Sequence, residues 1–382
     1  MSLLQETNDL FNQVDEAILD LKVLQAETSE TMELVNNLLS KITENIKILD
    51  PKEPEPEPKK IIINDKVDNL CDLLDIAKKY GSVNVNINEN VNINVKILFD
   101  LIEPLEKMNK SIGMGNVKTQ ILDLILTSMQ DLYDSKTLFH SIITGPPGVG
   151  KTMLAKILGE IYLRLGILKN TEYVFKIARR SDLIGKYLGH TALKTQELID
   201  SCEGGVLFID EVYSLGNDDK KDSFSKECID TINLNLTEKE NFICIIAGYP
   251  EEIESCFFSV NPGLKRRYPF KYEINNYTYE ELSEIFLSKL MQAEWKVNVQ
   301  KEELLDFFKE NKKAFQYFGG DIDNLILNCR TCHSKRIFGR NSDLRKIIVF
   351  DDIKCGFEKF MNSKTQNKDN EGENVSYKNM YL

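Results

Sequence analysis

The spacing of hydrophobic positions changes several times along the 382-residue chain and divides it into segments. From about residue 105, short apolar runs alternate with stretches of helical spacing, which is typical of a parallel α/β sheet with helices between its strands. Four runs are predicted to be buried strands, at residues 138–143, 173–177, 205–209 and 242–247. After Tyr277 the spacing becomes helical throughout, which predicts a helical region following the sheet.

The helical region after Tyr277 is predicted to contain four helices. Its helices are expected at residues 281–291, 301–315, 321–337 and 351–360. Beyond residue 362 the chain is polar, and we expect a disordered tail over 363–382.

The N-terminal segment, residues 1–50, has a different pattern. An apolar seam with alternating spacings of three and four runs from Phe11 to Leu49, with polar interruptions at Gln25 and Thr28. A heptad seam of this length favours a coiled coil or helical hairpin, and the alternative is one amphipathic helix lying on the body of the protein. The proline- and glutamate-rich residues 51–60 are expected to be an extended linker.

The intermediate region, residues 61–104, leads to the sheet. Residues 65–80 are predicted to be helical, and a short helix is expected at 104–110, with Pro104 tolerated in its first turn. Between them, residues 83–97 alternate apolar side chains with asparagine. The period of two predicts a strand or hairpin with one solvated face, and an Asn-rich loop is the alternative.

A glycine-rich loop joins the first predicted strand to the next helix, and this strand–loop–helix context indicates a phosphate site. Its glycines let backbone N–H groups surround an anion, and the helix that follows adds its positive end. We therefore expect a nucleoside triphosphate here, with Lys151 reaching the β- and γ-phosphates and Thr152 ligating Mg²⁺. The expected nucleotide-binding residues are Gly145, Pro146, Pro147, Gly148, Val149, Gly150, Lys151, Thr152, Met153, Ile112 and Gly113.

An acidic pair, Asp210 and Glu211, ends the third predicted strand. Alone it would be an ordinary solvent-facing pair, but after a phosphate loop it indicates the second half of a nucleoside-triphosphatase site. Asp210 is expected to hold hydrated Mg²⁺. Glu211 is expected to polarise the water that attacks the γ-phosphate.

The phosphate loop, the acidic strand end and the C-terminal helices together resemble an AAA+ ATPase, a P-loop NTPase with a parallel sheet and a helical lid. Finer motifs resemble the CbxX/CfxQ branch, which includes red-type Rubisco activases and relatives in large DNA viruses. These motifs are Arg-Ser-Asp-Leu-Ile-Gly-Lys-Tyr-Leu-Gly-His-Thr-Ala-Leu-Lys-Thr at 180–195, Ala-Gly-Tyr-Pro at 247–250 and Asn-Pro-Gly-Leu-Lys-Arg-Arg at 261–267. The resemblance covers roughly residues 105–360 and implies a nucleotide-binding domain at 105–273 and a lid at 274–362.

The resemblance also implies partners and further site residues. It implies a homo-oligomer, a hexameric ring, with ATP at subunit boundaries and a neighbour's arginine at the γ-phosphate. Arg267 matches this arginine finger better, and Arg266 is the second candidate. The alternative is that the two arginines are an ordinary surface pair. Tyr187 matches the loop that faces the central pore and would grip a protein client, the alternative being a tyrosine that packs its own turn.

Two positions depart from the family pattern. The first sensor, commonly Asn, falls on or near Tyr249. In the second-sensor region, residues 319–325, Asp323 stands where many relatives carry an arginine. Either another lid cation such as Arg330 substitutes, or the lid does not sense the γ-phosphate.

Composition narrows the function. With 48 basic and 60 acidic residues the net charge is −12, which argues against a nucleic-acid coat, and the chain shows neither a secretory signal pattern nor an apolar run long enough to span a bilayer. We expect a soluble, intracellular (cytoplasmic) protein with its eight cysteines reduced. The Cys-x-x-Cys-His match at 329–333 is interpreted as lid-helix sequence, and His140 and His190 as structural.

The preferred function is an ATP-hydrolysing remodeller of a protein client whose identity the sequence does not reveal. A nucleic-acid motor and a nucleotide-regulated assembly scaffold are the alternatives.

Overall fold

The computed structural model describes residues 65–80, 95–170, 172–187, 189–216, 223–340 and 342–378, with side chains up to Thr365. The chain divides into two units, Met1–Pro58 and Lys59–Leu382, and the described residues all belong to the second. The predicted coiled coil, the linker and residues 83–94 of the Asn-rich segment lie outside the described residues. Residues 95–97 of that segment begin a helix, α4 (Val95–Asp100), so the predicted strand is wrong there.

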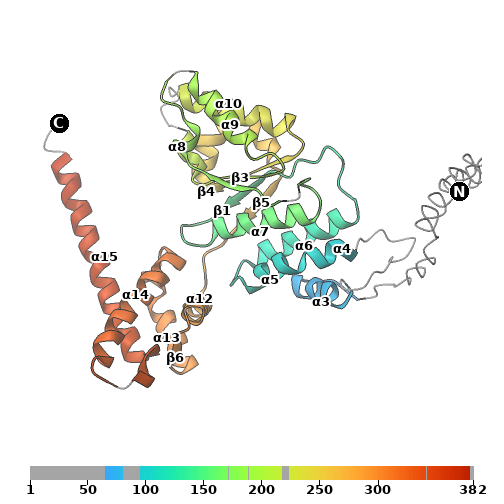
Figure 1. Cartoon of the computed structure of the whole chain (residues 1–382). Helices are drawn as coiled ribbons and strands as arrows, with labels where there is room; N and C mark the ends of the chain where they lie inside the picture. Colours follow the sequence, from blue (N-terminus) through green and yellow to red (C-terminus); the bar gives the residue numbers. More distant parts are fainter. Residues whose placement is uncertain are drawn as a thin grey trace, which may run out of the picture. The chain divides into compact units, whose positions relative to one another are not determined.

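A parallel sheet with strand order β2-β3-β4-β1-β5 forms the centre of the described unit (Figure 1). Four strands confirm the predicted runs, with somewhat different ends. The fifth, β5, was not predicted, because it is a four-residue edge strand that pairs with β1 and includes a lysine and a glutamate. The strands are β1 Ser141–Thr144, β2 Phe175–Ala178, β3 Gly205–Ile209, β4 Phe242–Gly248 and β5 Phe270–Glu273.

Helices cover both faces of the sheet because successive side chains of each buried strand point to opposite faces. In β3, Val206 and Phe208 enter one hydrophobic cluster, whereas Leu207 and Ile209 enter another. The first cluster includes residues of α3 (Leu70–Tyr80), α5 (Ile102–Lys110), α6 (Gly115–Met129) and α7 (Lys151–Arg164). The second includes residues of α8 (Arg180–Leu183), α9 (His190–Asp200) and α10 (Ser223–Glu238).

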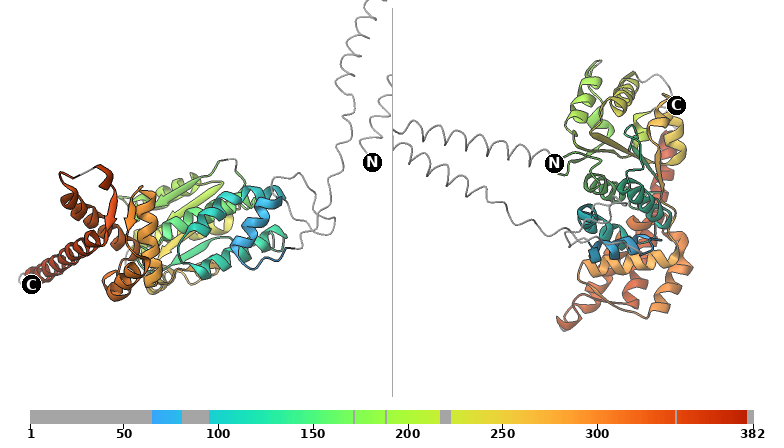
Figure 2. Two further views of the ribbon diagram at one scale, coloured as in Figure 1. Left: turned by 90° about the horizontal axis from the view of Figure 1, so that it is seen from below. Right: turned by 90° about the vertical axis from the view of Figure 1, so that its right-hand side faces the viewer.

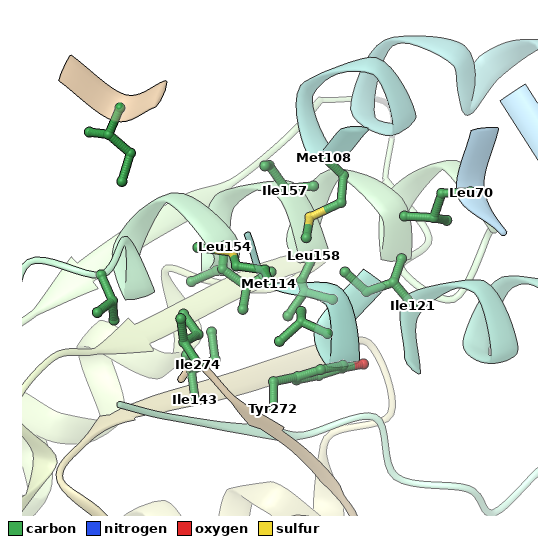
Figure 3. Close-up of a cluster of buried hydrophobic side chains, with 14 of the residues drawn as sticks. Leu70, Met108, Met114, Ile121, Ile143, Leu154, Ile157, Leu158, Tyr272 and Ile274 are labelled. Carbon is green, nitrogen blue, oxygen red and sulfur yellow. The ribbon is translucent and has the colours of Figure 1, made fainter. Parts of the chain in front are cut away.

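Figure 3 shows part of the first cluster. Ile143 of β1 and Tyr272 of β5 lie below α7, whose Leu154 and Leu158 point toward them, and Met108 of α5 packs from above. These side chains are buried. Burying each large apolar side chain contributes roughly 1.5–3 kcal/mol, so this layer fixes α7 and the loop that precedes it against the sheet.

The lid, α12–α15, follows the sheet, as the resemblance implied (Figures 1 and 2). A capping box between Thr278 and Glu281 begins its first helix. A two-stranded parallel pair, β6 (Lys296–Asn298) with β7 (Ile347–Val349), was not predicted because three-residue strands are too short to show a period. The helices are α12 Tyr279–Gln292, α13 Lys301–Asn311, α14 Phe318–Ile337 and α15 Phe350–Lys378.

The tail expected to be disordered beyond residue 362 is helical as far as Lys378, because α15 continues without a break. The segment contains no proline, and its lysine, glutamine and glutamate residues have good helix propensity, so a helix started by the packed part of α15 can propagate through it.

One disulfide corrects the expectation that all cysteines are reduced. Cys332 of α14 bonds Cys355 of α15, whose Cα atoms lie 6.2 Å apart although the residues are 23 positions apart in sequence. A pairing across two helices has no local sequence signal. The neighbouring His333 places Nδ1 3.3 Å from a carboxylate oxygen of Asp352, and no group of three metal-ligating side chains occurs in the described part of the chain. The Cys-x-x-Cys-His match lies within α14, where its interpretation as lid-helix sequence placed it.

Short helical turns complete the connections. They are a 3₁₀ turn at Val212–Leu215, α11 at Pro250–Glu252, a π-helical turn at Ile253–Phe258, and 3₁₀ turns at Leu264–Arg267, Lys312–Ala314 and Ser342–Leu344. None of the helices within the described ranges is both long and apolar enough to cross a bilayer.

Candidate active site

The candidate site lies where three adjacent strands end. Because β3, β4 and β1 are neighbours and parallel, their carboxyl ends meet at one edge of the sheet. The phosphate loop, Gly145–Thr152, follows β1, the acidic pair follows β3 and Tyr249 follows β4. A cavity of about 450 Å³ at this edge is lined from the sheet side by Pro147, Gly148, Gly150, Lys151, Thr152, Asp210, Glu211, Tyr213, Gly248 and Tyr249.

The phosphate loop has a conformation that requires glycine. Gly148 and Gly150 have φ of 77° and 98°, a region that side-chain-bearing residues rarely adopt. The Lys151 ammonium donates hydrogen bonds of 2.9 Å to the carbonyl oxygens of Gly145 and Pro146. Burial lowers the pKa of Lys151, and the charges of Asp210 and Glu211 oppose that shift. Both carboxylates therefore help to keep the lysine cationic for a phosphate.

Glu211 has a constrained backbone. Its φ of 52° is left-handed, which is uncommon for a residue other than glycine and costs of order 1–3 kcal/mol. Its N–H donates a 3.1 Å hydrogen bond to the Asp210 carboxylate. Both carboxylates line the cavity. A strained residue held beside a phosphate loop is a feature of functional sites rather than of ordinary strand ends.

Tyr249, expected at the first-sensor position, lies in the cavity, and Tyr213 lies beside it. The two rings stack with centroids 5.7 Å apart, and the Lys151 ammonium is 5.4 Å from the Tyr249 ring centroid. Burial, together with the charge of Glu211, raises the pKa of Tyr213 to about 12, so its hydroxyl stays protonated. The sequence interpretation missed Tyr213, for which its position two residues after Glu211 was the available signal.

Thr152 and Asp210 suit a magnesium ion. Both line the cavity, and hydroxyl and carboxylate oxygens are ligands that Mg²⁺ prefers. Mg²⁺ is commonly held by one or two protein ligands together with substrate phosphates and water, so a larger cluster of carboxylates is not needed. The residues present therefore fit the ion.

The lid contributes the remaining wall of the cavity, through Lys289, Gly319, Gly320 and Asp323. The Gly319 N–H donates a 3.1 Å hydrogen bond to the Gly148 carbonyl, which joins the start of α14 to the phosphate loop. Lys289 of α12 was not predicted, because nothing in the sequence around it indicates a nucleotide site. Arg330 is not among the lining residues, and its guanidinium instead lies 5.2 Å from the Trp295 ring centroid. The suggestion that Arg330 substitutes for the second-sensor arginine is wrong.

Other predicted nucleotide contacts lie outside this cavity. Gly145 and Pro146 contribute the carbonyls that hold Lys151, and the buried Val149 accepts a 2.8 Å hydrogen bond from the Tyr277 hydroxyl. Met153 is partly exposed, and Ile112 and Gly113 do not line the cavity. A Cβ placed on Gly113 would meet Tyr277 and Glu281, so this segment lies against the start of α12.

The predicted finger and pore residues are also outside the cavity. Arg267 donates from Nε to the Thr237 hydroxyl at 2.7 Å and from its terminal nitrogen to the Gly263 carbonyl at 2.9 Å, while Arg266 is exposed. Tyr187 is 67% exposed, with its ring edge-on to His190.

His140 has a structural role, as expected. Its Nε2 lies 2.9 Å from the Leu236 carbonyl, and its Nδ1 accepts a 3.0 Å hydrogen bond from the Cys244 N–H. Burial lowers its pKa to about 4, so the ring is neutral and links α10 to β4.

This fold and this site together define a P-loop ATPase. Residues 141–268 match the family model described as "ATPase family associated with various cellular activities (AAA)". The chain belongs to the CfxQ-like branch of the AAA ATPases, and it is an enzyme that binds and hydrolyses ATP with Mg²⁺.

Two CfxQ relatives carry that assignment, and a third protein is also similar to this chain. A cfxQ-like protein of Acanthamoeba polyphaga mimivirus is 48% identical over 275 residues, covering 70% of this chain and 67% of that protein. A CfxQ homologue of Cyanidium caldarium is 31% identical over 64% of this chain and 90% of its own length. Stage V sporulation protein K of Bacillus subtilis is 35% identical, and the match covers 53% of this chain and 64% of that protein. Among solved structures, the FIGL-1 AAA domain in complex with ADP aligns over 65% of this chain and 82% of that one, at 17% identity and a TM-score of 0.48.

Proposed function

We propose that this chain works as a ring of identical subunits, a hexamer, that uses ATP hydrolysis to remodel a protein client. The observation that carries the proposal is the shared cavity. One wall holds the phosphate loop and the strand-end carboxylates, and the other wall belongs to the lid. Hydrolysis of ATP to ADP in this cavity therefore shifts α14, whose Gly319 is hydrogen-bonded to Gly148 of the phosphate loop.

Within the cavity each residue has a distinct role. Glu211 accepts a proton from the water that attacks the terminal phosphate. Lys151 leaves the carbonyls of its own loop and neutralises phosphate charge, and Tyr249 orients the groups around that phosphate. Mg²⁺ held by Thr152 and Asp210 would supply further charge neutralisation at the transferred phosphate.

Arg267 completes the site of the adjacent subunit. Its guanidinium is held by Thr237 and Gly263 and does not line the cavity of its own chain. A fixed, partly exposed arginine with this placement is suited to act in trans, with Arg266 as the reserve.

Tyr187 is the proposed client-gripping residue, and the base of its loop is fixed. The Gly185 N–H donates to the Thr191 hydroxyl at 3.1 Å, and the Lys194 ammonium donates to the Ile184 carbonyl at 3.1 Å. A Cβ on Gly185 would lie 2.8 Å from the backbone of His190, so the turn tolerates no larger residue. This clamp holds the loop ends while the tyrosine ring stays exposed.

The test uses Glu211→Gln, which is expected to bind ATP, fail to hydrolyse it and retain its client. Client proteins captured with ATP but not with ADP are identified, and the same capture is repeated with the Glu211→Gln, Tyr187→Ala double variant. Capture is expected to be lost while ATP binding persists. If the double variant retains the client equally well, Tyr187 does not grip it, and rapid hydrolysis by Glu211→Gln would exclude Glu211 as the base.

A further inference from the structure

The lid carries one cation that faces the nucleotide cavity in the described part of the chain, Lys289. It lies in the last turns of α12 and is one-third exposed. Its ammonium donates to both carboxylate oxygens of Asp323, at 2.6 Å each, and is 3.4 Å from the Gly319 carbonyl. Asp323 and Gly319 belong to α14, so Lys289 joins two lid helices at the cavity wall.

The cavity is the phosphate end of the site. It is lined by Lys151, Asp210 and Glu211, whereas Ile112 and Gly113 do not reach it. Glu211 marks the place where water would attack the terminal phosphate, so a lid cation in the same cavity faces that phosphate.

We propose that Lys289 is the lid residue that recognises the terminal phosphate of ATP, and that Asp323 holds its ammonium in position until the nucleotide binds. This inference rests on the proposed function. It assigns to Lys289 of α12 the sensing of the γ-phosphate, for which many relatives use an arginine in the second-sensor region.

When ATP binds, it is favourable for the Lys289 ammonium to leave Asp323 and bind the terminal phosphate. Ion pairs between partly exposed side chains contribute little, because water screens them and two side chains must be ordered, so the Lys289–Asp323 pair is easily broken. A terminal phosphate offers more negative charge and three acceptor oxygens in a cavity that the lid partly shields from water. ADP lacks that group, so the ammonium stays with Asp323, and the lid distinguishes the two nucleotides.

The experiment compares ATP and ADP affinities by titration calorimetry, in the full chain carrying Glu211→Gln so that ATP persists. Adding Lys289→Met is expected to weaken ATP binding about 10- to 100-fold while changing ADP binding less than about twofold, and Lys289→Arg is expected to restore most of the ATP affinity. Asp323→Asn breaks the same ion pair but keeps the ammonium, so ATP affinity should be unchanged or raised. Lys346→Met is the matched control, since Lys346 pairs with Glu294 on the lid surface at 3.1 Å, outside the cavity.

Other outcomes separate the two hypotheses. If Lys289→Met weakens ATP and ADP binding equally, or leaves both unchanged, the Lys289–Asp323 pair only fastens α12 to α14 and the inference fails. If the parent Glu211→Gln protein binds neither nucleotide, the proposed function fails instead.

Discussion

The two walls of the nucleotide cavity are built in different ways. On the sheet side, Asp210 and Tyr249 directly follow strands β3 and β4, and Lys151 ends the loop that follows β1. On the lid side, Lys289 and Asp323 are 34 residues apart on two helices and meet only through the packing of those helices. A site built from strand ends can be read from sequence, whereas one built from packed helices cannot.

The largest expected effect is a loss of ATP turnover when the arginine that a second subunit supplies to the sheet side of the cavity is removed. Arg267→Ala is expected to reduce ATP turnover by about 10³–10⁵, because a guanidinium at the γ-phosphate stabilises charge in the transition state. Arg266→Ala is the control and should cost far less. Phosphate release at saturating ATP measures both.

Mixing two inactive proteins tests whether Arg267 acts in trans. Lys151→Ala subunits supply the arginine and Arg267→Ala subunits supply an intact phosphate loop, so mixed rings should regain part of the activity. The absence of recovery over a range of mixing ratios would contradict the assignment of Arg267 as a residue that acts in trans. The active site would then need no residue from a second subunit.

The next prediction is a loss of stability that is confined to the lid. Cys332→Ser removes the disulfide to Cys355 that closes a loop of 23 residues, and loop-closure entropy predicts a loss of about 3 kcal/mol from lid stability. The chain has a single tryptophan, Trp295, and it lies in the lid with its ring 5.1 Å from that of His333. Its fluorescence during urea unfolding therefore reports on the lid.

Cys71→Ser is the matched control, because Cys71 is an exposed free thiol on α3 and not in the lid. It should leave the tryptophan transition unchanged. A lid that unfolds at the same urea concentration with and without the disulfide would show that helix packing alone holds α14 against α15.

These two regions also show how much the sequence predicts. The phosphate loop and the acidic pair are contiguous motifs beside continuous apolar runs, so their role and their strands follow from local pattern. Edge strand β5 was missed because it has only four residues, two of which are charged. Lys289 and the Cys332–Cys355 disulfide depend on contacts between helices distant in sequence, which no local period encodes.

The contact between the two walls gives a third prediction. Gly148 has φ of 77°, and a Cβ there would clash with the Tyr317 carbonyl oxygen. Gly148→Ala adds about 1–2 kcal/mol of backbone strain and must push the start of α14 away, so ATP affinity should fall about 10- to 100-fold. Gly115→Ala is the control, because a Cβ at that position meets nothing within 4 Å. Equal ATP affinities for the two variants would show that the lid does not close on the phosphate loop at this point.

The smallest effect is a pH dependence that belongs to the sheet domain and not to the lid. Burial lowers the pKa of His140 from 6.5 to about 4 in the folded protein. Between these values the unfolded chain binds a proton at this position and the folded chain does not, so stability falls as pH falls. The contribution is about 2 kcal/mol between pH 6.5 and 5.0, at about 1.4 kcal/mol per pH unit.

His140→Gln lacks the titrating ring and should flatten this part of the stability profile, although it lowers stability at every pH by disturbing the bonds to Leu236 and Cys244. Urea unfolding followed by circular dichroism at pH 6.5 and 5.0 gives the difference for both proteins. The Trp295 transition of the lid should change with pH by the same amount in the two proteins, because the hydrogen bonds of His140 are to Leu236 of α10 and Cys244 of β4. A profile as steep in His140→Gln as in the wild type would assign the pH dependence to other groups.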